Sequence, residues 1–460
     1  MQRTHLRQLG AVVLGLSLVA AACGSSSKTA ATTTTKAGGV TTTAAGTVTT
    51  TSAAAAATGS KAGALAGMKG TLPLVELSSD FKKRLDAINP NLKGTYNYAA
   101  ETYDAVVIIA LAVTKAKSDG IEYAKEINGI TRGGEKCKDY VACKALIDAG
   151  KDPDYDGLSG PLEFGGNGEP LQASYGIQVF GSNNKIDDAA TKYKQAKAPT
   201  SADVAQVAVT GTRAGDGQLK IGTILPQTGS LAFLGPPEFA AFDLVVKEIN
   251  AAGGVLGKPI IAIVGDSGDS STDTVNQTTD RLLAEKVDAI IGAASSGVSL
   301  KVIDKITGAG IVQFSPANTS KKLSDYADKG LYFRTAPSDI LQAAVLGEII
   351  AGDGAKNVAI IARNDAYGTG LSEDLEKALT AAGSKVVVKK IYDEKAEKFN
   401  AEVNEIKAAK PDAIAIIGFD ESSKILTAMV EAGVGPKSVK VYGCDGNMGS
   451  ALGEAFDAGK

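Results

Sequence analysis

The chain has 460 residues, enough for two or three domains, and 44% of them are hydrophobic. Its formal net charge of −3 argues against a nucleic-acid-binding surface. The only histidine is His5, inside a predicted targeting segment, which excludes Ser-His-Asp and Cys-His catalysis and most zinc sites. We therefore expect no cofactor and no metal.

Targeting signals occupy the start of the chain. Residues 1–22 begin with Arg3 and Arg7, continue as a short apolar run and predict a secretion signal peptide. Small residues come before Cys23, as in a bacterial lipoprotein signal, so we expect lipidation of Cys23. An ordinary signal peptide with an incidental cysteine is the alternative. The Thr-, Ala- and Ser-rich composition of 23–62 predicts a disordered tether.

A first folded segment covers 63–195. Residues 68–75 are expected to be extended. A helix is predicted at 98–117, and it is expected to be buried because apolar residues fall on most of its faces. A second helix is expected at 122–130. This segment precedes the regular part of the chain and has mixed secondary structure.

Two local signals fall in the second half of this segment. Cys137 and Cys143 lie close together in an exported chain without further ligands, which favours a disulfide over a metal site. Strands are expected at 160–164 and 173–180. The sequence Gly165-Gly166-Asn167-Gly168 between them predicts a hairpin.

A weakly patterned linker, 196–217, is followed by a regular series of strands and helices. The strands are expected at 219–225, 260–264, 331–335, 358–362, 386–392, 413–417 and 439–442. Such alternation indicates α/β structure with mostly parallel sheets. Two runs of this kind predict two similar lobes, 218–337 and 338–460.

The stretch 287–319 contains a buried strand, a turn of small and hydroxyl residues, a helix, and a second strand ending at Ser315 to Thr319. Both turns are expected at the carboxyl ends of parallel strands, where open α/β sheets bind ligands. The first turn also opens a helix, whose free N–H groups attract an anion. The stretch therefore predicts half of a binding cleft.

Five motifs carry a resemblance: KIGTILPQTGSLAFLGPPEF, IIGAASSGVS, FSPANTS, NDAYGTG and VYGCDGN. Together they resemble the leucine/isoleucine/valine-binding family of type 1 periplasmic binding proteins, the receptors of branched-chain amino-acid ABC transporters. The resemblance implies an α/β fold with two Rossmann-like lobes whose parallel sheets are joined by hinge strands.

The order of segments departs from the family pattern. Residues 63–195 resemble the family's C-terminal part and would contribute to both lobes. The chain therefore resembles a circularly permuted member, in which 196–217 joins the old termini. Exposed loops tolerate new termini, which makes such a rearrangement physically reasonable. A rearranged coding sequence is the alternative.

The motif match assigns ligand contacts in the lobe at 218–337. Ser296 and Thr319 would bind through their hydroxyls, Ala317 would bind through its backbone, and Ser295 is a neighbouring candidate. The alternative is that the serines only cap local structure, which is the commoner fate of serine at such turns.

The rest of the expected site follows from the same match. Asp445 matches the acidic residue that pairs with the ligand ammonium; a solvated loop aspartate is the alternative. The aromatic residues Tyr367 and Phe419 would cover the ligand, and Phe233 and Leu234 would form an apolar wall. Tyr98 and Glu101 are weaker candidates from the helix at 98–117. Any of the apolar residues could instead be ordinary core.

The resemblance implies an extracytoplasmic receptor, lipid-anchored to the outer face of the cytoplasmic membrane. It would capture a small neutral, branched-chain-like amino acid by closure of two lobes and deliver it to an ABC permease. We expect a monomer without enzymatic activity, which touches the membrane only through its anchor and binds no nucleic acid. The alternative is a sensor of amino acids or amides with the same cleft, not coupled to transport.

Overall fold

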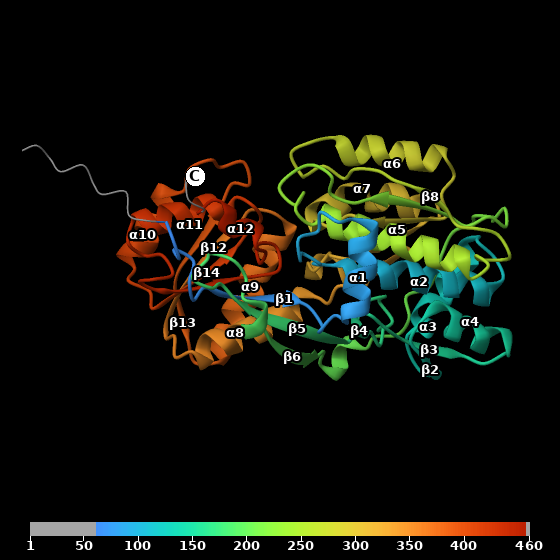
Figure 1. Ribbon diagram of the computed structural model, residues 1–460, viewed down its shortest axis with the longest axis horizontal. Helices are drawn as coiled ribbons and strands as arrows, with labels where there is room; N and C mark the ends of the chain where they lie inside the picture. Colours follow the sequence, from blue (N-terminus) through green and yellow to red (C-terminus); the bar gives the residue numbers. More distant parts are fainter. Residues whose placement is uncertain (1–60, 457–460) are drawn as a thin grey trace, which may run out of the picture. The chain divides into compact units, whose positions relative to one another are not determined.

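The computed structural model describes residues 61–456, which form a mixed α/β structure with two main sheets (Figure 1). The predicted signal peptide, Cys23 and the tether up to residue 60 lie outside the described residues. None of the helices between residues 61 and 456 has both the length and the apolar character to cross a membrane.

Lobe 1 is built on a five-stranded parallel sheet in the order β11-β10-β9-β7-β8. Its central strands are buried on both faces, as parallel sheets covered by helices require. The elements are β7 (Lys220–Ile224), β8 (Ile261–Ile263), β9 (Ala289–Gly292), β10 (Val312–Ser315), β11 (Tyr332–Arg334), α5 (Gly235–Ala251), α6 (Thr274–Ala284) and α7 (Ser296–Gly308).

Lobe 2 is built on a seven-stranded sheet in the order β13-β12-β14-β15-β1-β5-β6. Its strands are β1 (Lys69–Pro73), β5 (Gln172–Val179), β6 (Lys192–Lys197), β12 (Asn357–Arg363), β13 (Lys385–Tyr392), β14 (Ala413–Ile417) and β15 (Lys440–Gly443). Its helices are α8 (Asp339–Gly352), α9 (Ala366–Ala381), α10 (Asn400–Ala408), α11 (Ser422–Glu431) and α12 (Ala451–Glu454). Strand β1 runs parallel to β15 and antiparallel to β5, so early residues complete the sheet of the last segment.

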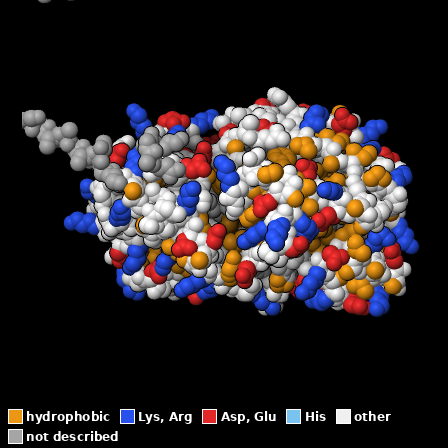
Figure 2. Space-filling model, viewed as in Figure 1, with side chains coloured by type: hydrophobic (Ala, Val, Ile, Leu, Met, Phe, Trp, Pro, Cys, Tyr) orange, Lys and Arg blue, Asp and Glu red, His pale blue; other side chains and the backbone are white. Residues whose placement is uncertain are grey.

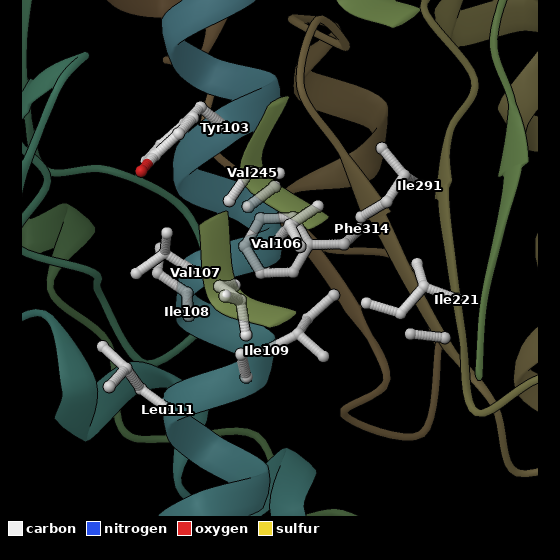
Figure 3. Packing of buried hydrophobic residues seen from close by; sticks show 14 of the residues in the cluster. Tyr103, Val106, Val107, Ile108, Ile109, Leu111, Ile221, Val245, Ile291 and Phe314 are labelled. Carbon is white, nitrogen blue, oxygen red and sulfur yellow. The ribbon is translucent and has the colours of Figure 1, made fainter. Parts of the chain in front are cut away.

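The remaining elements lie with lobe 1. They are α1 (Ser79–Ile88), α2 (Ala99–Ala116), α3 (Ile127–Ile130), α4 (Tyr140–Asp148), β2 (Glu135–Cys137), β3 (Pro153–Gly157) and β4 (Gly160–Pro161). Helix α2 is buried along almost its whole length, as predicted. Its Val106 and Ile109 belong to one apolar cluster with Phe314 and Ile291 of the sheet (Figure 3). This cluster fixes α2 against the sheet of lobe 1.

The structure corrects two local predictions. The hairpin around Gly165–Gly168 is reduced to an isolated bridge between Phe164 and Pro170, because β4 pairs with β3 and β5 joins the other sheet. The helix expected at 122–130 is a 3-10 turn, Ile121–Lys125, followed by the single turn of α3.

Cys137 and Cys143 are joined by a disulfide with a Cα–Cα distance of 5.3 Å.

Four segments connect the lobes: 74–78, 162–171, 335–338 and 198–219. The segment 198–219 contains most of the predicted linker, and it lies along lobe 1. The Thr210 N–H donates to the Lys329 carbonyl at 3.0 Å, and the Arg213 guanidinium pairs with Asp288 at 2.6 Å. On the face shown in Figure 2, basic and acidic side chains are interspersed, so no patch of a single sign dominates it.

Two buried glutamates stand in the first turns of α2 and α5. Glu101 is 5% exposed and Glu238 is fully buried, and neither carboxyl oxygen of Glu238 has a hydrogen-bond partner within 61–456. Burial raises the pKa of Glu101 to about 8. Burial and the nearby Glu101 raise the pKa of Glu238 well above its usual range. Glu101 is therefore mostly protonated in the folded state at neutral pH, and burial favours the protonated form of Glu238 as well.

This pair predicts a loss of stability as pH rises. The folded Glu101 keeps a proton that the unfolded chain releases near pH 4.5, so its contribution is complete below that pH and is lost as pH rises through about 8. We expect the free energy of unfolding of Glu101→Gln to fall less with rising pH than that of the wild type over this window, while Glu238 contributes the same pH dependence to both proteins. At pH 9 its free energy of unfolding should exceed the wild type's by up to roughly 5 kcal/mol, since a tenfold change in proton affinity is about 1.4 kcal/mol. Urea unfolding at pH 5 and pH 9 measures this, with the exposed Glu122→Gln as control. A variant that parallels the wild type at both pH values would rule out the assignment.

Candidate functional site

A cavity of about 10 Å³ lies between the two lobes. Lobe 1 contributes strand-end turns and the start of α7, and lobe 2 contributes the loops after β12, β14 and β15. The lining residues are Tyr98, Leu231, Leu234, Ala294, Ser295, Ser296, Ala317, Thr319, Tyr367, Phe419, Asp445 and Gly446. The lobes touch around it: the Ser320 hydroxyl donates to the Ala366 carbonyl at 2.8 Å, and the Ser270 hydroxyl donates to Glu394 at 2.6 Å.

The lobe 1 side offers hydroxyl groups at the start of α7. The Ser295 Oγ caps the helix by accepting the Val298 N–H at 3.4 Å, and the Ser296 Oγ accepts the Ser320 N–H at 3.3 Å. Both contacts use an oxygen lone pair and leave the hydroxyl hydrogen free to donate. Capping and ligand binding are therefore compatible for these two serines.

The turn after β10 is shaped by Ser315. Its hydroxyl donates to the Ala293 carbonyl at 2.8 Å and accepts the N–H groups of Ala317 and Asn318 at 3.2 and 2.9 Å. This bonding occupies the Ala317 N–H, so the carbonyl is the backbone group that Ala317 can offer to a ligand. Ser315 itself is used up in holding the turn.

On the lobe 2 side, Asp445 is held by two tyrosines. Tyr98 donates to its Oδ2 and Tyr367 donates to its Oδ1, both at 2.7 Å. Burial raises the pKa of Asp445, and these two hydroxyls lower it because they stabilise the carboxylate. Tyr98 also has φ 59°, a left-handed conformation that is costly for a bulky residue and is often found at functional sites.

A second acid lies behind the cavity. Asp339 opens α8, is fully buried, and neither of its carboxyl oxygens has a hydrogen-bond partner within the described part of the chain. Burial and the nearby Asp445 raise the pKa of Asp339 well above its usual range, with the Thr319 hydroxyl opposing the shift. Because only Asp445 accepts strong hydrogen bonds, we assign the negative charge to Asp445 and a proton to Asp339.

One wall of the cavity is formed by Tyr367 and Phe419, and Arg363 lies against Phe419 outside the lining. The rings of Tyr367 and Phe419 stack with centroids 5.3 Å apart, and the Arg363 guanidinium lies 3.8 Å from the centroid of Phe419. Tyr367 reaches this position because α9 begins at Ala366, capped by Asp365, which accepts the Gly368 N–H at 2.7 Å.

All the predicted ligand residues except Phe233 line this cavity. Phe233 instead lines a neighbouring cavity of about 190 Å³ that shares Phe419 with the first. Glu101 is not among the lining residues and lies near Glu238. Sequence reasoning missed Leu231, Ala294 and Gly446, although each is next to a predicted residue or within a quoted motif. No group of three or more metal-binding side chains occurs in the part of the chain that the structure describes.

The fold and the cavity define a two-lobed ligand-binding protein. The chain belongs to the periplasmic binding protein family: the family model described as "Periplasmic binding protein" matches residues 218–459. A second model, "Receptor family ligand binding region", matches residues 27–180.

The relatives with the most similar sequences include leucine/isoleucine/valine-binding proteins. The "Leu/Ile/Val-binding protein homolog 7" of Brucella abortus is 24% identical over 54% of this chain, and the match spans 63% of that relative. BraC3 of Rhizobium johnstonii, named a "Leu/Ile/Val-binding protein", is 27% identical over 53% of this chain and 69% of its own length. The chain thus spans less than two thirds of the first of these relatives. A solved structure of LivJ from Streptococcus pneumoniae, in complex with isoleucine, matches with 26% identity and a TM-score of 0.47, over 52% of this chain and 68% of LivJ.

Proposed function

We propose that this protein is an extracytoplasmic solute-binding receptor for a small neutral amino acid. One observation carries the proposal: Asp445, fixed by Tyr98 and Tyr367, shares a cavity with the hydroxyls of Ser296 and Thr319. A single carboxylate suits the ligand ammonium, and hydroxyl donors at the start of a helix suit the ligand carboxylate. The site thus supplies one partner for each charge of a zwitterion.

The rest of the lining supports a neutral ligand side chain. Leu231, Leu234, Ala294 and Phe419 provide an apolar wall. A charged side chain placed there would lose its hydration without gaining a partner, which costs several kcal/mol by the usual scale of buried charges. A small aliphatic side chain would gain burial instead. The names of the relatives, which refer to leucine, isoleucine and valine, agree with this proposal.

The contacts around the cavity suggest how capture works. The ligand would dock on the turns of lobe 1, and closure would bring Asp445 and Tyr367 of lobe 2 onto it. Closure is favoured only if the closed form makes ligand contacts that the open form lacks. The interlobe bonds of Ser320 and Ser270 would form in the same movement.

We propose that the chain is anchored through lipidated Cys23, works as a non-enzymatic monomer and delivers its ligand to an ABC permease. A sensor with the same cleft, not coupled to transport, is the alternative. We also propose that the segment order is circularly permuted, with 63–195 supplying parts of both lobes. The place of β1 between β15 and β5 supports this order.

A thermal-shift panel followed by calorimetry tests the ligand class. We expect stabilisation by leucine, valine or another neutral aliphatic amino acid, growing with concentration and reaching about 2.7 kcal/mol at 100 times the dissociation constant. Glutamate and lysine serve as controls for the apolar wall, and acetamide and urea as controls for the zwitterion. Stabilisation by the amides alone would replace the amino-acid proposal, and the absence of any shift with an amino acid would reject it.

A further inference from the structure

We propose that Arg334 is a positioning residue that aims the Thr319 turn at the ligand carboxylate. This inference rests on the proposed function, because it names the group that sets the preference of the same site for a free carboxylate. Arg334 ends β11 and is fully buried, and it is absent from the cavity lining. It therefore acts on the ligand only through the turn.

The guanidinium holds the turn on both sides of Thr319. Its Nη1 donates to the carbonyl of Asn318 at 3.2 Å and to the carbonyl of Ser320 at 2.9 Å. The carbonyl between them, that of Thr319, accepts the Asp339 N–H at 2.7 Å. The carbonyls of Asn318, Thr319 and Ser320 thus all accept hydrogen bonds from within the protein and are not available to a ligand. This arrangement leaves the Thr319 side chain, which lines the cavity, and the Ala317 carbonyl as the groups that the turn presents to a ligand.

The guanidinium is itself fixed from behind. Its Nε donates to Glu169 Oε2 at 3.0 Å, its Nη2 also bonds Glu169, and Nη2 donates to the Ser324 Oγ at 2.8 Å. The Ser324 hydroxyl in turn donates to Glu169 at 2.9 Å. Glu169 lies on the segment 162–171 that connects the lobes. The buried charge is therefore neutralised and its plane is set before a ligand arrives.

The geometry needs arginine. A guanidinium is a rigid planar fork that can serve two carbonyls and a carboxylate at once, whereas the lysine ammonium is a single point on a flexible chain. Lysine at this position keeps the charge but cannot hold Asn318, Ser320 and Glu169 together. In Arg334→Lys the turn should lose its fixed orientation, while the buried positive charge is kept. The variant therefore tests the orientation of the turn separately from the charge.

The test compares leucine with leucinamide, which keeps the ammonium and side chain but lacks the carboxylate. Calorimetry at pH 6.5 keeps both α-amino groups charged, because α-amino pKa values lie near 7.7–8.0. We expect the wild type to prefer leucine by at least roughly tenfold, as expected for loss of a charge-assisted hydrogen-bonding group. In Arg334→Lys the affinity for leucine should fall by about 10- to 100-fold and that for leucinamide by no more than about threefold, so the preference collapses.

Two further variants make the result decisive. Arg84→Lys, on α1 and outside the cavity, should leave the preference unchanged. Glu169→Gln keeps Arg334 but weakens the hold on its guanidinium, and it should reduce the preference by a smaller factor; it decides the question if Arg334→Lys does not fold. An equal loss for both ligands, or an unchanged preference in the folded variants, would overturn the positioning role. Failure of the wild type to bind leucine or any other amino acid would instead reject the proposed function.

Discussion

Asp445→Asn is expected to lower the affinity for a zwitterionic amino acid by roughly 30- to 4,000-fold, because removing one partner of a buried charge pair costs about 2–5 kcal/mol. The substitution keeps the shape of the side chain. Tyr98 and Tyr367 donate to different oxygens of Asp445, so in the variant one of them can donate to the amide oxygen and the other can accept from the amide NH2, and the cavity should persist. What the variant loses is the electrostatic attraction between the Asp445 carboxylate and the ligand ammonium. Calorimetric titration with the ligand identified by the panel measures it.

Two comparisons separate this charge effect from a general disturbance. Asp420→Asn alters an exposed acid on the loop that carries Phe419, outside the cavity lining, and should change the affinity by less than about threefold. A ligand without an ammonium, 4-methylpentanoate, should bind the wild type weakly and lose little in Asp445→Asn. Similar affinities of the two Asn variants for the amino acid would refute the ammonium assignment.

Arg363→Met is expected to destabilise the protein by about 3–5 kcal/mol, the usual cost of removing one member of a buried ionic network. Arg363 donates to Asp365 at 2.7 Å, to Glu421 at 2.8 Å and to Glu394 at 3.2 Å. Methionine fills much of the same volume but leaves these carboxylates without their common cation. Urea unfolding measures the effect, and an exposed pair provides the control: Lys424→Met removes the partner of Glu397 and should cost less than about 1 kcal/mol.

The pH dependence of this variant offers a second check. Carboxylates left without a cation have raised pKa values and bind protons more readily in the folded state. The destabilisation by Arg363→Met should therefore shrink as pH falls from 7 towards 5, because protonation removes the unpaired charges. A cost that stays constant with pH would mean that lost packing against Phe419, rather than charge, is responsible.

The loss of Arg363 should also affect ligand binding. Arg363 and Tyr367 lie against Phe419, so the ring that lines the cavity is held between them. Releasing one side lets the ring move, which weakens the apolar wall without touching Asp445. We therefore expect a reduced preference for leucine over alanine in Arg363→Met.

Much of the fold could be predicted from local patterns. The alternation of apolar strands with amphipathic helices predicted the parallel strands of both lobes, because strand and helix periodicities are properties of short windows. Helix α8 was not predicted, since its buried residues fall on most of its faces and leave no clear stripe. The hairpin at Gly165–Gly168 was predicted wrongly because turn residues show where a chain bends, and do not show which sheet its flanking strands join.

The sequence by itself determined the residue types at the strand ends: hydroxyls at Ser295, Ser296 and Thr319, and a carboxylate at Asp445. Only the tertiary structure decided what holds them. Tyr98 reaches Asp445 across 347 positions, and Arg334 reaches Glu169 across 165. Local sequence carries no record of such pairings, because they depend on how α2 and the 162–171 segment pack against distant strands. The charge state of Asp445 and the orientation of the Thr319 turn are therefore properties of the folded molecule.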